Sequence, residues 1–491
     1  MSRRKNACRL AVFTAIMATA GNVAAAEFPA TPPAPGPAPQ LSVPTPTAQT
    51  LANGLQVVSV RRAGLPLVTA QLIVRSGGEM DPPSLAGLAD LTANLLSKGA
   101  AGRSAPQIAA AAEALGGSLD AAAGWDESAV GITVTTPKLA QALGLLAKVV
   151  RQPDFSAEEL KRAQTQSLDD LRLTLSRPTA LASLAASRGV FGDGAYGHSR
   201  GGTPASIARI GRADVQRLHA TLYRPDNAIL VLAGDITPAQ AQQLAEASFG
   251  DWRKPATPLP ARPAGKAVSR LPAVLLIDQR GAGQAGVVAA HAAPSRSDDG
   301  YYVGTLANAV LGGSYSARLN EEIRIKRGLS YGAGSRFQPL RDAGLWLASA
   351  QTKNPSAAPV VELVLGEFKR LGDSRVGADE LAARKATLIG GYGRSLETTA
   401  GLAERVGELA VYGVPLDEIG KYIAKVQAVT PKQIEKYAKQ HLAAGAATVV
   451  VVGDAAQFAA DIRKAHPQAA LLQSTALDLD SPTLQLAGSR K

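Results

Sequence analysis

An arginine and a tyrosine, Arg324 and Tyr331, stand seven positions apart across the end of a predicted helix. The segment 318–331 has Leu319 and Ile323 on one helical face and charged residues on the other, which predicts an amphipathic helix that stops at the following glycine. A guanidinium fork and a phenolic hydroxyl at such a stop can bind one carbonyl oxygen or oxyanion together. The alternative interpretation is a surface helix with a solvated arginine.

A glycine turn precedes this segment, with Gly312 and Gly313 next to each other. Upstream, apolar alternation and helical spacing follow one another along the chain. The predicted strands are 54–60, 68–74, 128–134 and 228–233, and the predicted helices are 84–97, 106–115, 137–150, 157–175, a helical region to 188, and 212–222. Strands interleaved with long helices predict an α+β fold in which helices cover a sheet of antiparallel type.

The chain contains an internal repeat. The segments 210–236 and 429–455 are equally long and share the order helix, loop, apolar strand and Gly-Asp, and the Ala-Glu-Glu-Leu at 157–160 has a counterpart at 378–381. Two copies of one unit are therefore predicted. A segment with four prolines, 251–271, reads as the linker between an N-terminal domain, 51–250, and a C-terminal domain, 272–460.

The start of the chain has the pattern of an export signal. Residues 1–26 carry four basic residues, then a short apolar run and small residues, which is typical of a cleaved signal peptide and too short for a membrane span. We therefore expect a periplasmic protein. Residues 27–50 are proline-rich and predict an extended tether, and 461–491 is assigned as a tail that is polar at its end.

Composition excludes several classes of function. The only cysteine, Cys8, lies within the predicted signal peptide, so no thiol chemistry or disulfide is expected in the mature chain. Removal of residues 1–26 would lower the net charge from +12 to +8, a modest surplus for this length. The sequence has no dense basic run with interleaved aromatic residues, so no nucleic-acid partner is expected.

These motifs together resemble the pitrilysin and insulinase family of zinc peptidases, which includes the mitochondrial processing peptidase and bacterial two-chain peptidases. The resemblance rests on the two repeats, on Tyr-Arg-Pro-Asp-Asn at 223–227, and on the Gly-Gly turn with the helix up to Tyr331, and it covers about 50–456. It implies that each chain forms half of a clamshell chamber. It also implies that Arg324 and Tyr331 bind the substrate carbonyl and stabilise the oxyanion beside Gly312 and Gly313.

The zinc site is where this chain departs from the family pattern. Catalytic members carry His-x-x-Glu-His on a helix of the first half. Aligned on Lys98-Gly99, the corresponding residues are Asp90, Ala93 and Asn94, and the distal ligand position falls at Asp169. Alanine cannot serve as a general base, and an amide is a poor zinc ligand. The five histidines, which are His198, His219, His291, His441 and His466, are isolated in the sequence.

The resemblance and this departure together predict a non-catalytic subunit. We expect no catalytic residue, metal or cofactor on this chain alone. A partner that carries the His-x-x-Glu-His helix and the zinc would form a heterodimer with it and act on peptide substrates. One alternative is an inactive structural or peptide-binding member of the family. A lone peptidase is the least favoured alternative because Ala93 stands where the base should be.

Overall fold

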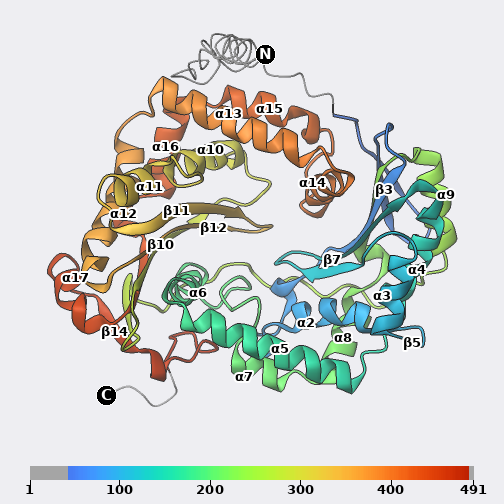
Figure 1. Cartoon of the computed structure of the whole chain (residues 1–491), viewed down its shortest axis with the longest axis horizontal. Helices are drawn as coiled ribbons and strands as arrows, with labels where there is room; N and C mark the ends of the chain where they lie inside the picture. Colours follow the sequence, from blue (N-terminus) through green and yellow to red (C-terminus); the bar gives the residue numbers. More distant parts are fainter. Residues whose placement is uncertain (1–42, 486–491) are drawn as a thin grey trace, which may run out of the picture. The chain divides into compact units, whose positions relative to one another are not determined.

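The computed structural model describes residues 43–485, which contain two sheets of six strands each (Figure 1). The first sheet has the order β1-β2-β8-β3-β7-β6 and the second has the order β11-β12-β10-β13-β9-β14. Their bounds are β1 Thr47–Thr50, β2 Gln56–Arg61, β3 Leu67–Val74, β6 Asp120–Ala123, β7 Ser128–Thr135 and β8 Ala228–Gly234, then β9 Val274–Asp278, β10 Ala285–Ala293, β11 Ser330–Pro339, β12 Gly344–Thr352, β13 Thr448–Gly453 and β14 Ala470–Gln473. A further hairpin pairs β4 (Gly99–Ala100) with β5 (Arg103–Ser104).

The inner strands of the two sheets share one arrangement, which confirms the predicted α+β fold with two similar halves. In each sheet a central strand, β8 or β13, pairs in parallel with one neighbour and antiparallel with the other. The sheets are therefore mixed rather than purely antiparallel. This difference follows from the order of the strands, because β8 and β13 each return to their sheet through helices instead of a hairpin.

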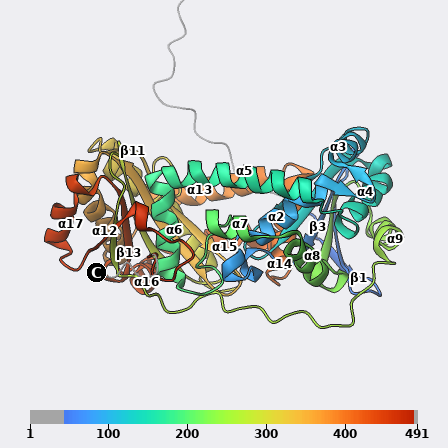
Figure 2. The ribbon, with the colours of Figure 1, turned by 90° about the horizontal axis from the view of Figure 1, so that it is seen from below.

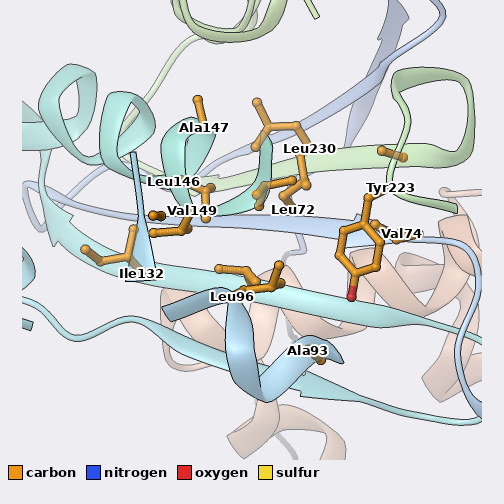
Figure 3. Packing of buried hydrophobic residues seen from close by; sticks show 14 of the residues in the cluster. Leu72, Val74, Ala93, Leu96, Ile132, Leu146, Ala147, Val149, Tyr223 and Leu230 are labelled. Atoms are coloured by element: carbon orange, nitrogen blue, oxygen red, sulfur yellow. The ribbon is translucent and has the colours of Figure 1, made fainter. Parts of the chain in front are cut away.

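The helices of the first half are α2 (Leu88–Leu95), α3 (Ala105–Glu113), α4 (Leu139–Arg151), α5 (Ala157–Ser176), α6 (Pro178–Phe191), α7 (Pro204–Arg209), α8 (Arg212–Leu222) and α9 (Pro238–Phe249). Helices α7 and α9 were not predicted, and the others begin and end within a few residues of their predicted bounds, apart from the start of α2. Residues 83–85 form a separate 3-10 turn ahead of α2. The structure places Leu146 and Val149 of α4 against Ile132 and Leu230 of the first sheet (Figure 3). Full burial of each such side chain contributes about 1.5–3 kcal/mol.

The second half has helices α10 (Tyr301–Leu311), α11 (Arg318–Asn320), α12 (Ala357–Asp373), α13 (Ala378–Ser395), α14 (Thr399–Val411), α15 (Glu418–Ala428), α16 (Pro431–His441) and α17 (Ala459–Ala465). The helix predicted over 318–328 is a short α-helical turn, α11, followed by a π turn, η6 (Glu321–Ile325). Leu319 and Ile323 are both fully buried, as their spacing predicts. Gly328, at φ +61°, closes the turn in the left-handed region.

Each half contributes one helix to the sheet of the other half. Helix α6 packs on β10, β12 and β13, while α14 packs on β3 and β8 (Figure 1). The contact of α6 is close, because a Cβ atom on Gly286 of β10 would lie 2.3 Å from the backbone nitrogen of Thr179. Each sheet is thus covered on one face by helices of its own half and on the other by the exchanged helix. The two halves are therefore interlocked.

The connection between the halves, from Phe249 to Val274, contains no helix or strand. Figure 2 shows it as an extended trace along the lower side. The side chain of Arg224, which is 2% exposed, donates to the carbonyl oxygens of Pro255 and Thr257 at 3.2 and 2.7 Å. The proline-rich segment is therefore fixed to the first half by a buried guanidinium.

Two edge strands differ from the sequence expectations. Strand β1 occupies the last residues of the predicted tether, and β14 pairs in parallel with β9 inside the predicted tail. Both strands have only four residues, so their apolar alternation is too short to be read from the sequence. The predicted signal peptide, 1–26, and most of the tether lie outside the described residues. Within 43–485 no helix has the length and apolar character needed to cross a bilayer.

Candidate functional site

The structure brings Arg324 and Tyr331 together. The Cζ atom of Arg324, on the π turn η6, lies 5.1 Å from the ring centroid of Tyr331, which is within the range of a cation–π contact. A second ring, that of Tyr315 in the glycine turn, has its centroid 5.0 Å from the same atom. The rings are 88% and 66% exposed, so the group stands on the surface of the chain. The predicted pair is therefore assembled on a single chain.

Strand β11 directs the side chain of Tyr331. It is the edge strand of the second sheet, and its register with β12 shifts between Ser330 and Ala333. The Ser330 hydroxyl donates to the carbonyl oxygen of Gly332 at 2.6 Å and accepts the N–H of Gly332 at 3.0 Å. Such an irregularity re-aims a side chain at a strand end. It places Tyr331 outside the regular ladder, on the exposed side.

The glycine turn lies directly on β11. The N–H of Ser335 donates to the carbonyl oxygen of Gly312 at 3.0 Å, and a Cβ atom on Gly312 would approach that nitrogen to 2.2 Å. The N–H of Gly313 donates to the carbonyl oxygen of Asn308 at 2.8 Å. Only a residue without a side chain permits this approach of turn and strand. The predicted role of these glycines beside the site therefore has a steric reason.

Buried polar side chains hold the turn. Arg384 of α13 donates to the hydroxyls of Ser314 and Ser316 at 3.1 and 2.8 Å, on either side of Tyr315. Asn320 donates to the carbonyl oxygen of Tyr315 at 2.6 Å and accepts the N–H of Ala333 at 3.3 Å. Arg384 and Asn320 are 8% and 3% exposed. The exposed group thus rests on a preorganised support.

The basic residues around Arg324 are paired with an acid, whereas Arg324 is not. Neighbouring Lys326 and Arg327 both pair with Glu322, at 2.6 and 2.5 Å, and their hydrogen bonds lower the pKa of that carboxyl below its usual value. Within residues 43–485 Arg324 itself forms no ion pair with an acid. The nearest charges on the turn are therefore satisfied without it, and its guanidinium is free to bind a carbonyl or an anion.

Helix α2 carries the residues that the resemblance aligns with the zinc motif, and most of it is buried in the core. Ala93 is fully buried in the core of the first half (Figure 3), so no proton acceptor faces the site at that position. Asp90 accepts a hydrogen bond from Arg200 at 3.3 Å. Burial raises the pKa of Asp90, and the charge of Arg200 opposes this rise. Arg200 also donates to the carbonyl oxygen of Ala123 on β6. A protein cation therefore sits against the carboxylate that a metal would need.

The remaining positions do not complete a metal site. Asn94 is partly exposed on α2, and Asp169 is exposed on α5, where it pairs with Arg172 at 2.5 Å. No group of three or more histidine, cysteine, aspartate or glutamate side chains in the described part of the chain could hold a metal ion. The aligned ligand positions therefore offer two carboxylates, each paired with an arginine, and one amide, and this set does not fit zinc.

A buried cluster of one arginine and two acids joins the halves and was not predicted from the sequence. Arg341, in the loop between β11 and β12, lies 3.1 Å from Glu79 and 3.5 Å from Asp126, which are 3% and 0% exposed. Tyr196 also donates to Asp126 at 2.6 Å. Burial raises the pKa of Glu79 to about 7, although the Gly77 N–H and Arg341 oppose this. No motif marks these residues, because they come from distant segments.

Two family models match the chain in sequence. The insulinase model of peptidase family M16 matches residues 56–187, and the model described as peptidase M16 inactive domain matches residues 209–388. An uncharacterized zinc protease of Streptomyces coelicolor is 24% identical over 396 residues, which are 80% of this chain and 86% of that protein. One of Bacillus subtilis is 22% identical over 394 residues, which are 80% and 94% of the two chains.

Solved structures resemble the fold. A peptidase M16 inactive domain from Pseudomonas fluorescens superimposes with a TM-score of 0.78 and 27% identity, and the match covers 83% of this chain and 98% of that chain. A protease from Helicobacter pylori gives a TM-score of 0.79 at 18% identity, covering 84% and 100%. A chain of complex III2 from Candida albicans gives 0.70 at 15% identity, covering 85% and 99%. The last two show the fold alone.

Proposed function

Because the chain belongs to the insulinase-type M16 peptidase family, we propose that it is the non-catalytic subunit of a zinc metalloendopeptidase. One observation carries this proposal. Arg324 and Tyr331 stand assembled, with Arg324 half-buried and unpaired with any acid among the described residues and Tyr331 exposed, while Ala93 fills the position of the catalytic base with a buried methyl group. The chain thus has the carbonyl-binding pair of a hydrolytic site, whereas a core residue occupies the position of the catalytic base.

The proposed role follows from the chemistry of the retained side chains. The guanidinium edge of Arg324 and the hydroxyl of Tyr331 would donate hydrogen bonds to the carbonyl oxygen of a peptide substrate. These bonds strengthen as the oxygen becomes negative in the tetrahedral intermediate. Zinc on the partner subunit would supply the activated water that this chain does not provide. Tyr331 is exposed and Arg324 is half-buried, so a second chain would have to exclude water from the pair.

The predicted signal peptide supports a periplasmic location for this activity. No cofactor is assigned to this chain. The partner would be a similar chain with an intact His-x-x-Glu-His helix, and the two would form a heterodimer. The alternative is an inactive structural or peptide-binding member of the family, which the Asp90–Arg200 pair would equally suit.

The first experiment tests complex formation. We expect this chain, co-expressed with a His-x-x-Glu-His family member from the same genome, to purify as a 1:1 particle by size-exclusion chromatography with light scattering. The reason is that the exposed Tyr331 and the half-buried Arg324 need a second chain to exclude water from them. A chain that remains alone with every such family member of its genome, yet binds peptides, would support the structural alternative instead.

A further inference from the structure

A third residue of the site, Tyr315, is not explained by the fold. Its side chain is 66% exposed, so it contributes little to the core. The large apolar or aromatic side chains that are exposed within residues 43–485 include Tyr315, Ile325 and Tyr331, which all lie next to Arg324 in the chain or in space. Aromatic residues and arginine together are typical of binding hot spots. Two exposed aromatic rings beside one arginine therefore indicate a functional role rather than a structural one.

The backbone that carries Tyr315 is more constrained than an exposed turn needs. The residues before and after it are fixed by Arg384, and its own carbonyl oxygen is fixed by Asn320 at 2.6 Å. Arg318, which begins α11, is held in turn by two hydrogen bonds to Glu380 at 2.9 and 2.7 Å. These supports fix the backbone that carries the ring of Tyr315. In this structure the ring centroid lies 5.0 Å from the Cζ atom of Arg324.

We propose that Tyr315 is a positioning residue that, with Tyr331, holds the guanidinium of Arg324 in the orientation that receives a peptide carbonyl or carboxylate. This inference rests on the proposed function of Arg324. An arginine side chain has several rotatable bonds, and fixing them in advance removes an entropy cost from substrate binding. A ring contact orients the planar group while leaving its N–H edge free. The acids near the turn are occupied by Lys326 and Arg327, so a ring is the restraint that does not neutralise Arg324.

The test uses nuclear magnetic resonance on the mature chain with 15N-labelled arginine, without a partner. Aromatic rings at this distance shift the Nε–H signal of Arg324, which is assigned by its loss in Arg324→Lys. We expect Tyr315→Ala to move this signal and to leave that of Arg327 unchanged, and Tyr315→Phe to restore it because the ring remains. An unmoved Arg324 signal in Tyr315→Ala would overturn the proposal.

A second readout separates this inference from the proposed function. In the complex with the zinc-bearing chain, Tyr315→Ala should lower kcat/KM for an internally quenched peptide by about tenfold, the range of a cation–π contact, and Tyr315→Phe should stay near the wild type. If Tyr315→Ala moves the Arg324 signal but no complex hydrolyses peptides, the positioning role stands and the proposed function fails. If hydrolysis is unchanged in Tyr315→Ala, the positioning role fails alone.

Discussion

Replacing Arg324 by alanine in the complex with the zinc-bearing partner should lower kcat/KM for peptide hydrolysis by about 10²–10³, the usual cost of removing one oxyanion donor. The guanidinium forms no ion pair with an acid within the described residues, so its charge would be available to a bound substrate. Arg324→Lys should recover only part of the activity, because an ammonium is a point charge without the planar fork of donors. Steady-state kinetics on a quenched peptide measures both variants.

Arg327 provides the matched control. It lies on the same turn with the same charge, but its guanidinium is paired with Glu322 at 2.5 Å. Arg327→Ala should therefore leave kcat/KM within about twofold of the wild type, since Arg327 is engaged by Glu322, and Glu322 would keep its pair with Lys326 at 2.6 Å. Equal losses for Arg324→Ala and Arg327→Ala would mean that the turn acts through its overall charge, and the assigned role of Arg324 would be wrong.

The second large effect concerns stability. Replacing Arg341 by methionine should lower the free energy of unfolding by about 3–5 kcal/mol at pH 8, because Asp126 would remain buried without its cation and Glu79 would keep only the more distant Arg262, at 3.9 Å. The loss should be smaller at pH 5. The pKa of Glu79 is raised to about 7, so at pH 5 its carboxyl is protonated and needs no cation. Urea unfolding at the two pH values measures the difference.

The raised pKa of Glu79 also sets the direction in which pH changes the stability of the wild-type chain. A carboxyl whose folded pKa exceeds its unfolded value binds more protons when folded, so its contribution favours the folded state at low pH and is lost as pH rises through about 7. Glu79→Gln should remove this contribution of Glu79 to the pH dependence and also rescue part of the Arg341→Met loss.

Arg280, exposed beside Asp278 at 3.4 Å, is the control for Arg341→Met, and Arg280→Met should change the free energy of unfolding by about 0.5 kcal/mol or less. A loss in Arg341→Met no larger than this control would contradict the account.

Local pattern predicted most of the fold because local forces decide those elements. The apolar alternation of β3 and β7 and the helical spacing of α4 each bury one face, and the structure follows them closely. The exchange of α6 and α14 was not predictable, since a buried helix face does not reveal which sheet will cover it. The π turn at η6 was also missed, because its one-residue difference from an α-helix leaves Leu319 and Ile323 buried in either case.

The candidate site divides in the same way. The convergence of Arg324 and Tyr331 was predictable, because the two residues are only seven positions apart and the helix stop between them keeps them close in space. Tyr315 was not, since its contact depends on how the glycine turn folds over β11. The pairing of Arg200 with Asp90 joins segments 110 residues apart, and a lone arginine in a glycine-rich loop carries no signal for it. Ion pairs between segments far apart in the chain are therefore the part of the site that a single sequence predicts least.

We propose that this chain binds the electrophile and that its partner makes the nucleophile. The most direct test is the zinc content of the purified mature chain, measured beside its peptide hydrolysis, and then the same pair of measurements on the complex. The account predicts no stoichiometric zinc and no cleavage for the chain alone, and one zinc per heterodimer with cleavage that a chelator stops. One zinc per isolated chain, together with chelator-sensitive hydrolysis, would contradict it.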